Sequence, residues 1–90
     1  MTITQVEWLE NRGVNNASRM KVVLFLASGP KIMSHVAEVC NMSTAAITGL
    51  ADGMEKSGIL TRERSKTDRR AIALELTEKG REALQAIKEL

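Results

Sequence analysis

Hydrophobic residues recur at intervals of three and four positions through the first third of the chain, which is the spacing of one face of an α-helix. The pattern predicts a short first helix over residues 4–12. It also predicts a second helix that ends near Ser28, because Gly29 and Pro30 do not continue a helix. The second helix is so apolar that we expect it to be almost wholly buried. The residues expected to face inward are Ile3, Val6 and Leu9 in the first helix, and Met20, Val22, Val23, Leu24, Phe25, Leu26 and Ala27 in the second.

Polar residues that can cap helices divide the next segment into two short helices. Ser34 is placed to begin a third helix, which ends in a turn at residues 41–42. Ser43 is placed to begin a fourth helix, which runs through Ser57 and ends at Gly58. Two short helices joined by a turn of this length are typical of the helix-turn-helix motif, although many helical hairpins share the pattern. The expected inward faces are Val36, Ala37 and Cys40 in the third helix, and Ala46, Ile47, Leu50 and Met54 in the fourth.

The spacing of apolar residues changes to every second position in the last third of the chain. Residues 59–64 and 71–76 alternate in this way, as the two strands of a β-hairpin do. Thr77 is then placed to cap a final helix that extends to Leu90. The shared apolar face of the second strand is Ile72, Leu74 and Leu76, and that of the final helix is Ala83, Leu84, Ile87 and Leu90.

The order of these elements predicts one α+β domain, mostly α, over residues 1–90. Ninety residues are enough for a single domain with a thin core. A helix-turn-helix at about 34–57 would be followed by a two- or three-stranded antiparallel wing at about 59–76, which is the arrangement called a winged helix-turn-helix.

Positive charge is concentrated in the segment between the two expected strands. The net charge of the chain is +2, but residues 61–70 hold five basic and two acidic side chains, so the other residues sum to −1. A basic loop at the tip of a hairpin is suited to contact a polyanion such as nucleic acid. The alternative is a solvated hairpin, because Lys and Arg also keep exposed strand edges soluble.

The remaining chemistry in the sequence is sparse. The lone Cys40 lies at an apolar helical position, so we expect a buried thiol, and His35 has no evident metal partners. No nucleophile with a neighbouring base, phosphate-binding glycine loop or Cys–His cluster is present, so we expect neither catalysis nor a cofactor. A single cysteine, the lack of a signal-peptide pattern and the shortness of the apolar run at 22–27 favour a soluble, cytoplasmic protein.

The chain resembles the winged-helix DNA-binding domain of the MarR family of bacterial transcription regulators. Asp68-Arg69-Arg70, followed after five residues by Leu76-Thr77-Glu78-Lys79-Gly80, is similar to the family pattern Asp-x-Arg, short strand, Leu-Thr-x-x-Gly. Residues 33–38 resemble the first helix of the family's helix-turn-helix, and residues 43–50 resemble its recognition helix. The resemblance covers roughly residues 18–84.

The resemblance implies that duplex DNA is the partner and that the recognition helix, residues 43–57, enters the major groove. Hydroxyl groups there could bond to phosphates or base edges, and methyl groups could meet thymine methyls. Two of these residues have a simpler alternative role, because Ser43 could serve only as the helix cap and Thr48 could be an ordinary surface residue. The residues expected nearest DNA are Ser43, Thr44, Ala45 and Thr48.

The resemblance also implies that the basic wing, residues 62–70, follows the adjacent minor groove, whose negative potential attracts Arg. Asp68 is expected to pair with Arg70 or a nearby Arg and so to hold the loop in shape. Arg62, Arg64, Lys66 and Arg69 are expected to contact phosphates or to add long-range attraction.

Two departures from the family pattern leave a second function open. The recognition helix carries Gly49 and Gly53 where basic residues are common in the family, so its face could instead dock against protein. The chain is also shorter than usual. The candidate interface of a homodimer is the first helix, with Trp8, and the last helix, with Leu84, Ile87 and Leu90. The apolar stripe of the last helix could equally pack on its own domain.

We thus expect a DNA-binding transcription regulator, with repression as its mode of action. The alternative is a winged-helix protein-interaction module without sequence-specific DNA binding. The sequence gives no operator and no small-molecule effector.

Overall fold

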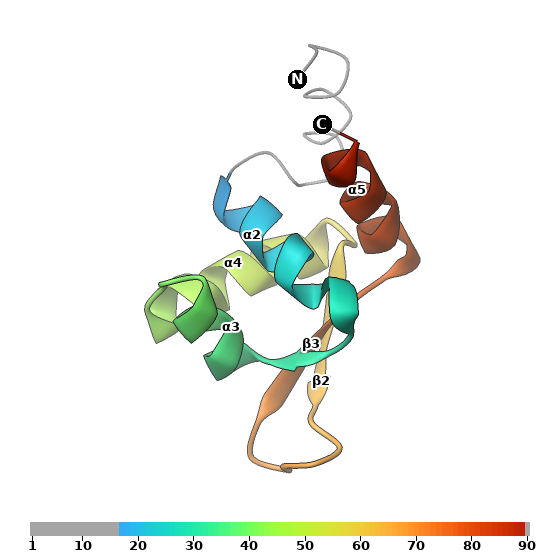
Figure 1. Cartoon of the computed structure of the whole chain (residues 1–90). Coiled ribbons are helices and arrows are strands. Elements are labelled where there is room, and N and C mark those ends of the chain that lie inside the picture. Colours follow the sequence, from blue (N-terminus) through green and yellow to red (C-terminus); the bar gives the residue numbers. More distant parts are fainter. Residues whose placement is uncertain (1–16, 90) are drawn as a thin grey trace.

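The computed structural model of the chain describes residues 17–89 (Figure 1). The expected first helix at 4–12 and Leu90 lie outside the described residues. The fold is the expected α+β winged helix-turn-helix, in which the four described α-helices and one 3-10 helix pack beside an antiparallel sheet whose hairpin projects away from them. The elements are α2 (Ala17–Phe25), the 3-10 helix η1 (Leu26–Ser28), β1 (Lys31–Ile32), α3 (Met33–Val39), α4 (Thr44–Lys56), β2 (Leu60–Arg64), β3 (Ile72–Leu76) and α5 (Glu78–Lys88).

Helix α2 is buried along one side only. Val22, Val23 and, in the following η1, Leu26 are fully buried, as expected, whereas Leu24 is 46% exposed. The expectation that Leu24 faces inward was wrong, because a helix packed on one side of a small domain keeps its opposite side in water even where that side is apolar. The α-helix ends at Phe25, and the 3-10 helix η1 continues to Ser28, where the helical run was expected to end. Gly29 follows with a φ of 125°, which lies in the region that favours glycine.

Helix α3 begins directly after strand β1, one residue before the expected cap. Its N-cap is Ile32, which provides no side-chain hydrogen bond, and Ser34 lies within the first turn. The prediction that Ser34 caps this helix was therefore wrong. The chain passes from a strand paired with β3 straight into the helix, so the position of the helix start is set by strand pairing rather than by a polar side chain. The expected inward face, which consists of Val36, Ala37 and Cys40, is buried.

The turn between α3 and α4 has the expected place and cap. Asn41 adopts a left-handed conformation with φ of 56°, and the Met42 N–H donates to the carbonyl oxygen of Ala37 over 2.8 Å. The hydroxyl oxygen of Ser43 then accepts a hydrogen bond from the Ala46 N–H over 3.1 Å. The prediction that Ser43 caps α4 is confirmed.

Helix α4 buries a face slightly different from the one expected. Ile47 and Met54 are buried and Leu50 is partly buried, but Ala46 is exposed and Ala51 takes its place in the core. Ile47, Ala51 and Met54 are four and three residues apart, so they form the stripe of α4 that packs on the core. Ala46 lies beside this stripe, so the expectation that it faces inward was wrong.

The sheet has three antiparallel strands in the order β1-β3-β2. In the β2–β3 hairpin Leu60 pairs with Leu76, and Arg62 pairs with Leu74. Opposite residues point to the same side of a sheet, so the buried leucines place the Arg62 side chain on the side of the sheet that faces the helices. This register determines the role of Arg62 described below.

Helix α5 is joined to the end of the hairpin by the expected cap. The Gly80 N–H donates to the Thr77 hydroxyl over 3.0 Å, which confirms the predicted capping role of Thr77. Ala83 and Leu84 are buried in their own domain, and α5 lies against α2. Leu84, one of the residues considered for a dimer interface, is thus 7% exposed and occupied by internal packing. Within residues 17–89, no helix is long and apolar enough to cross a membrane.

Candidate nucleic-acid interface

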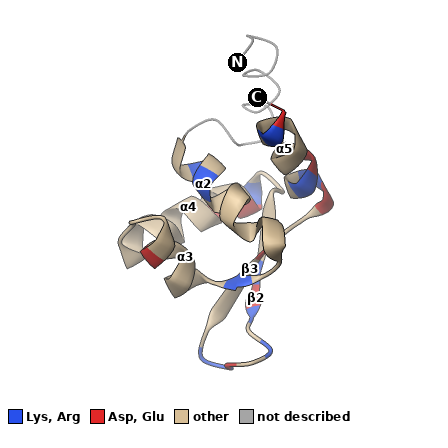
Figure 2. Cartoon of the chain, viewed as in Figure 1, with Lys and Arg blue, Asp and Glu red and all other residues tan. Residues whose placement is uncertain are grey.

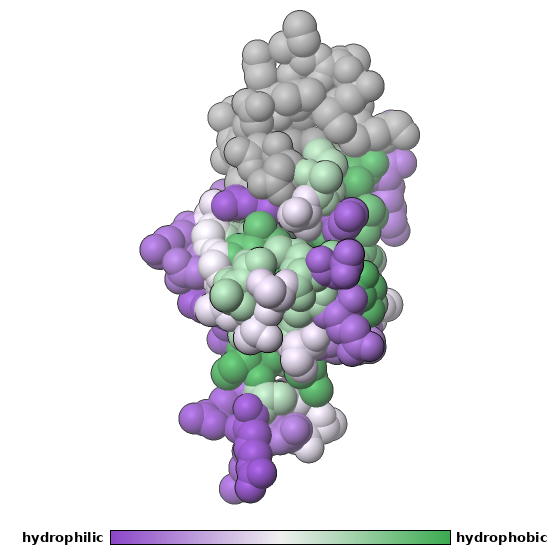
Figure 3. Space-filling view, turned by 90° about the vertical axis from the view of Figure 1, so that its left-hand side faces the viewer, coloured by the Kyte–Doolittle hydropathy of each residue, from purple (hydrophilic) through white to green (hydrophobic). Residues whose placement is uncertain are grey.

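The start of α4 presents a surface of small, uncharged residues. All four positions predicted to lie nearest DNA are exposed. Two of their hydroxyl groups form local hydrogen bonds, because Ser43 caps the helix and the Thr48 hydroxyl donates to the carbonyl oxygen of Thr44 over 2.8 Å. No charged residue occurs in α4 before Asp52, and the face that carries α3 and α4 is correspondingly pale in Figure 3, above a hydrophilic wing tip.

The two glycines of α4 have different surroundings. A Cβ on Gly53 would lie 2.8 Å from the Nη2 atom of Arg19 on α2, so this part of the helix is covered by the protein itself. A Cβ on Gly49 would meet nothing within 4 Å. Only Gly49 therefore leaves open the close approach of another molecule.

The wing loop is organised by Ser65, a residue to which the sequence analysis assigned no role. Ser65 is the one polar residue that is buried among the described residues. Its hydroxyl oxygen accepts hydrogen bonds from the N–H groups of Thr67 and Asp68 over 3.2 and 3.3 Å, and lies 3.0 Å from the Thr67 hydroxyl. Its own N–H donates to the carbonyl oxygen of Ala71 over 2.9 Å, which closes the loop. A Ser followed two and three residues later by Thr and Asp is a turn pattern that could have indicated this role.

Two further hydrogen bonds shape the tip of the wing. The Asp68 carboxylate accepts from the backbone N–H of Arg70 over 3.0 Å, and Arg64 Nη1 donates to the carbonyl oxygen of Arg69 over 2.8 Å. Asp68 does hold the loop, as expected, but its hydrogen bond is to the backbone of Arg70 rather than to the guanidinium. This leaves the guanidinium group of Arg70 exposed.

Four cations are exposed around this loop, and Figure 2 shows their positive charge at the tip of the wing. Ser65 and Asp68 hold the backbone, so the loop is shaped before any partner arrives. The four exposed cations are Arg64, Lys66, Arg69 and Arg70.

Arg62 is separated from these cations by its contacts with α4. Its Nε and Nη2 atoms donate to Glu55 Oε1 over 3.2 and 2.9 Å, and Nη2 also lies 3.2 Å from Asp52 Oδ1. Lys56 contacts the other oxygen of Asp52 over 3.1 Å. The hydrogen bond and charge of Lys56, with a smaller effect of Arg62, lower the pKa of Asp52 below its usual value. We call these four residues the Arg62 cluster.

A cavity of about 280 Å³ joins the start of α4 to the base of the wing. Its walls come from β1, α3, α4, the wing loop and β3, so the two surfaces expected to contact DNA lie on the same side of the molecule. The lining residues are Ile32, Met33, Ser34, Thr44, Ile47, Asp68, Arg70, Ala71 and Ile72.

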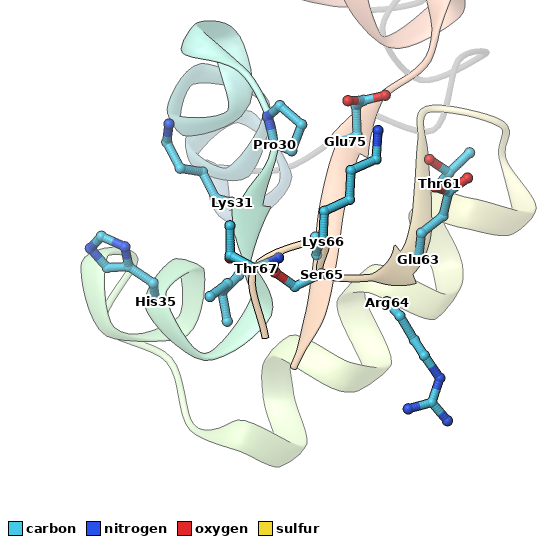
Figure 4. Close-up of a pocket in the computed structure, with 12 residues that line it drawn as sticks. Pro30, Lys31, His35, Thr61, Glu63, Arg64, Ser65, Lys66, Thr67 and Glu75 are labelled. Carbon is cyan, nitrogen blue, oxygen red and sulfur yellow. Dashed lines mark hydrogen bonds between the residues drawn. The ribbon is translucent and has the colours of Figure 1, made fainter. Parts of the chain in front are cut away.

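A second hollow, of about 520 Å³, lies on the outer face of the sheet (Figure 4). Lys66 extends along the sheet in the direction of Glu75, whereas Arg64 points away. Because Glu63 and Glu75 both line this hollow, its charge is mixed and it suits a polyanion less well than the wing tip does. His35, on its rim, is exposed and packs edge-on against Phe25 with ring centroids 5.4 Å apart.

The helix-turn-helix, the three-stranded sheet and the basic loop define a winged-helix domain with a preformed wing. A sequence model of the MarR family matches residues 13–71. The chain therefore belongs to the MarR family.

Similarities to individual proteins agree with this assignment. The chain is 36% identical over 72 residues to the uncharacterized HTH-type transcriptional regulator YfiV of Bacillus subtilis, an alignment that covers 79% of this chain and 45% of YfiV. The crystal structure of YusO, also from B. subtilis, superposes with a TM-score of 0.80 at 28% identity and covers 94% of this chain and 60% of YusO. The transcriptional repressor CouR, bound to a 23-mer DNA duplex, superposes with a TM-score of 0.77 at 27% identity, covering 93% of this chain and 60% of CouR. The chain thus spans about half of the length of YfiV and rather more of the two structures.

Proposed function

We propose that the protein is a transcription regulator that binds double-stranded DNA. The observation that carries the proposal is the shared orientation of two unlike surfaces. The uncharged start of α4 and the cationic tip of the wing flank one cavity and so can meet one duplex together. The similarity to CouR, a repressor whose structure is bound to a DNA duplex, supports DNA as the partner.

In this proposal α4 enters the major groove by its first two turns. Small side chains allow the helix backbone to lie close to the base edges, and the exposed methyl groups of Thr44 and Ala45 can contact thymine methyls. The Ser43 hydroxyl oxygen accepts the capping hydrogen bond, so its O–H can still donate to a phosphate or a base edge. The Thr48 hydroxyl already donates within the helix, so its oxygen can accept a hydrogen bond from a base.

The wing supplies most of the attraction to phosphate. Arg70 lines the same cavity as Thr44 of α4 and would enter the minor groove beside the recognition helix. Arg64, Lys66 and Arg69 would contact the sugar-phosphate backbone. Arg62 stands apart from this group, because its guanidinium is already bound by two carboxylates of α4.

We further propose that the protein acts as a repressor and as a homodimer, in the cytoplasm and without catalytic activity. A dimer would match a two-fold symmetric operator. Since Leu84 is buried within its own domain, any contact between two copies through α5 would use the exposed side of that helix.

A selection of bound duplexes from a random pool tests this function. We expect a palindromic consensus, followed in fluorescence anisotropy by an affinity that falls steeply as salt rises. The variants Arg64→Gln, Lys66→Gln and Arg70→Gln should each weaken binding. Each lost phosphate contact should reduce the slope of log K against log salt by about 0.9. An absence of duplex binding at low salt, or affinities unchanged by all three substitutions, would contradict the proposal.

A further inference from the structure

Arg62 is the one basic residue of the wing strands whose side chain is bound to the recognition helix. We propose that Arg62 is a positioning residue, which fixes the angle between α4 and the wing rather than contacting phosphate. The inference rests on the proposed DNA-binding function for its biological meaning, but the geometry on which it depends is internal to the domain.

The contact between Arg62 and Glu55 is a fork of several hydrogen bonds rather than a loose ion pair. Two guanidinium nitrogens donate to Glu55 Oε1, and the backbone N–H of Arg62 donates to Glu55 Oε2 over 3.2 Å. The Glu55 carboxylate therefore binds both the backbone and the side chain of the same strand residue. Such a bidentate arrangement fixes orientation as well as distance.

The fork bridges the turn that connects the helix to the strand. Between Glu55 and Arg62 the chain turns through Gly58, which has a φ of 80°, and Lys79 donates to the carbonyl oxygen of Ser57 over 2.7 Å. Leu60 is anchored in the core before the hairpin leaves it. Arg62 is the next residue on the same side of β2, and its hydrogen bonds to Glu55 tie the hairpin to α4 two residues before the strand ends.

A small change of angle at Arg62 has a large effect at the tip. At about 3.3 Å per residue the tip lies roughly 15 Å beyond Arg62, so a tilt of about 10° would move it by roughly 3 Å. A displacement of that size is as long as a hydrogen bond and would separate Arg70 or Lys66 from a phosphate.

The local charge makes a direct phosphate contact by Arg62 unfavourable. Asp52 and Glu55 both bind its guanidinium, and Lys56 is the only other cation in the Arg62 cluster. A phosphate would have to displace Glu55 to reach Arg62. The two roles consequently predict opposite effects when Glu55 loses its charge.

The decisive experiment compares Glu55→Gln with Glu63→Gln in the full chain. Both substitutions remove one negative charge from the same region, but Glu63 is exposed on the other face of β2. If Arg62 positions the wing, Glu55→Gln should weaken duplex binding by about tenfold, which is within the range of coupled residues in one network, despite the added positive charge. Glu63→Gln should bind as tightly as the parent or slightly more tightly. Binding by Glu55→Gln that equals or exceeds that of Glu63→Gln would overturn the inference.

The salt dependence of an Arg62 variant separates positioning from phosphate contact. Arg62→Gln should lower affinity while keeping the slope of log K against log salt, whereas a lost phosphate contact would reduce that slope by about 0.9. If circular dichroism shows that Arg62→Gln or Glu55→Gln is unfolded, Asp52→Asn removes the outer partner of Arg62 and should give a smaller loss of affinity with the same unchanged slope.

A measurement without DNA distinguishes failure of this inference from failure of the proposed function. Residual dipolar couplings of backbone amides report the orientation of the wing relative to α4. They should change for the wing in Arg62→Gln but remain at parent values in Glu63→Gln. Unchanged couplings in Arg62→Gln would refute the positioning role. Failure of the parent protein to bind any duplex would refute the proposed DNA binding. The dipolar couplings would still decide whether Arg62 fixes the orientation of the wing.

Discussion

Gly80 lies against the carbonyl oxygen of Ile59 so closely that a Cβ at this position would collide with it. The first turn of α5 therefore packs on the backbone that leads into the wing. The glycine of the Leu-Thr-x-x-Gly pattern is required by this close approach rather than by its backbone angles, because Gly80 lies within a helix.

The contrast between Gly80 and Gly49 gives a first prediction. Gly80→Ala should destabilise the fold by about 2 kcal/mol or more, since the obstructing atom belongs to the backbone and cannot move aside cheaply. Gly49→Ala should stabilise it by about 1 kcal/mol, because a methyl group there meets nothing and alanine favours the helix. Urea unfolding of both variants measures the two changes. Equal effects of the two substitutions would contradict the described packing.

Gly53 gives an intermediate case on the same helix. A Cβ at Gly53 would approach the Arg19 guanidinium, which is the far end of a flexible side chain and can shift. We expect the gain in helix propensity and the cost of moving Arg19 to offset each other in Gly53→Ala, leaving the free energy of unfolding within about 0.5 kcal/mol of the parent. A loss of stability in Gly53→Ala as large as that in Gly80→Ala would show that the Arg19 side chain cannot shift to make room for the methyl group.

A second prediction concerns the two serines that precede helices. Ser43→Ala should lower stability by about 1 kcal/mol, because it removes the acceptor for the Ala46 N–H. Ser34→Ala should have an effect below about 0.5 kcal/mol, since Ser34 is exposed and lies within the first turn of α3 rather than at its cap. Thermal unfolding of the matched pair checks this assignment. A larger loss for Ser34→Ala would restore the capping role that the sequence suggested.

The features predicted correctly from sequence are those set by neighbouring residues. Ser43 and Thr77 cap helices through bonds three residues along the chain, so their role is readable locally. The burial of Ala51 in place of Ala46 was not readable, because helical spacing defines a stripe but not which side of that stripe faces the core. Strand β1 consists of only two residues and pairs with β3 more than forty residues later, so no local pattern marked it.

The roles of the charged residues in the site also depend on contacts between distant parts of the chain. Arg62 and Arg64 look alike in the sequence, and both alternate in register with Leu60. Only the position of α4 next to β2 distinguishes them, because it gives Arg62 two carboxylate partners while Arg64 bonds to the loop backbone. The alternation alone could have shown that Arg62 shares the side of buried Leu60.

A third prediction tests the hydrogen bonds that Ser65 makes in the wing. Ser65→Ala removes the acceptor for two backbone N–H groups and should destabilise the fold by about 1–2 kcal/mol. The loop would then lose its shape while keeping all its cations. Duplex affinity should therefore fall with an unchanged salt slope. Thr67→Val is the control. Among the described residues, the hydrogen bond of the Thr67 hydroxyl is to Ser65, so its loss leaves both backbone N–H groups bound to Ser65 and should have a smaller effect.

The last prediction concerns the pH dependence of stability through Asp52. Lys56 and, to a lesser extent, Arg62 lower the pKa of Asp52 in the folded protein. The ionised carboxylate therefore stabilises the folded state relative to the unfolded state. A lowered carboxyl pKa contributes stability that is present above the unfolded value, 3.8, and is lost as the pH falls through the lower folded value. Asp52→Asn should therefore be less stable than the parent at neutral pH, and the difference should shrink below pH 3.8. Urea midpoints at several pH values measure it. A difference that stays constant down to the lowest pH would show that the Asp52 carboxylate adds nothing through its charge.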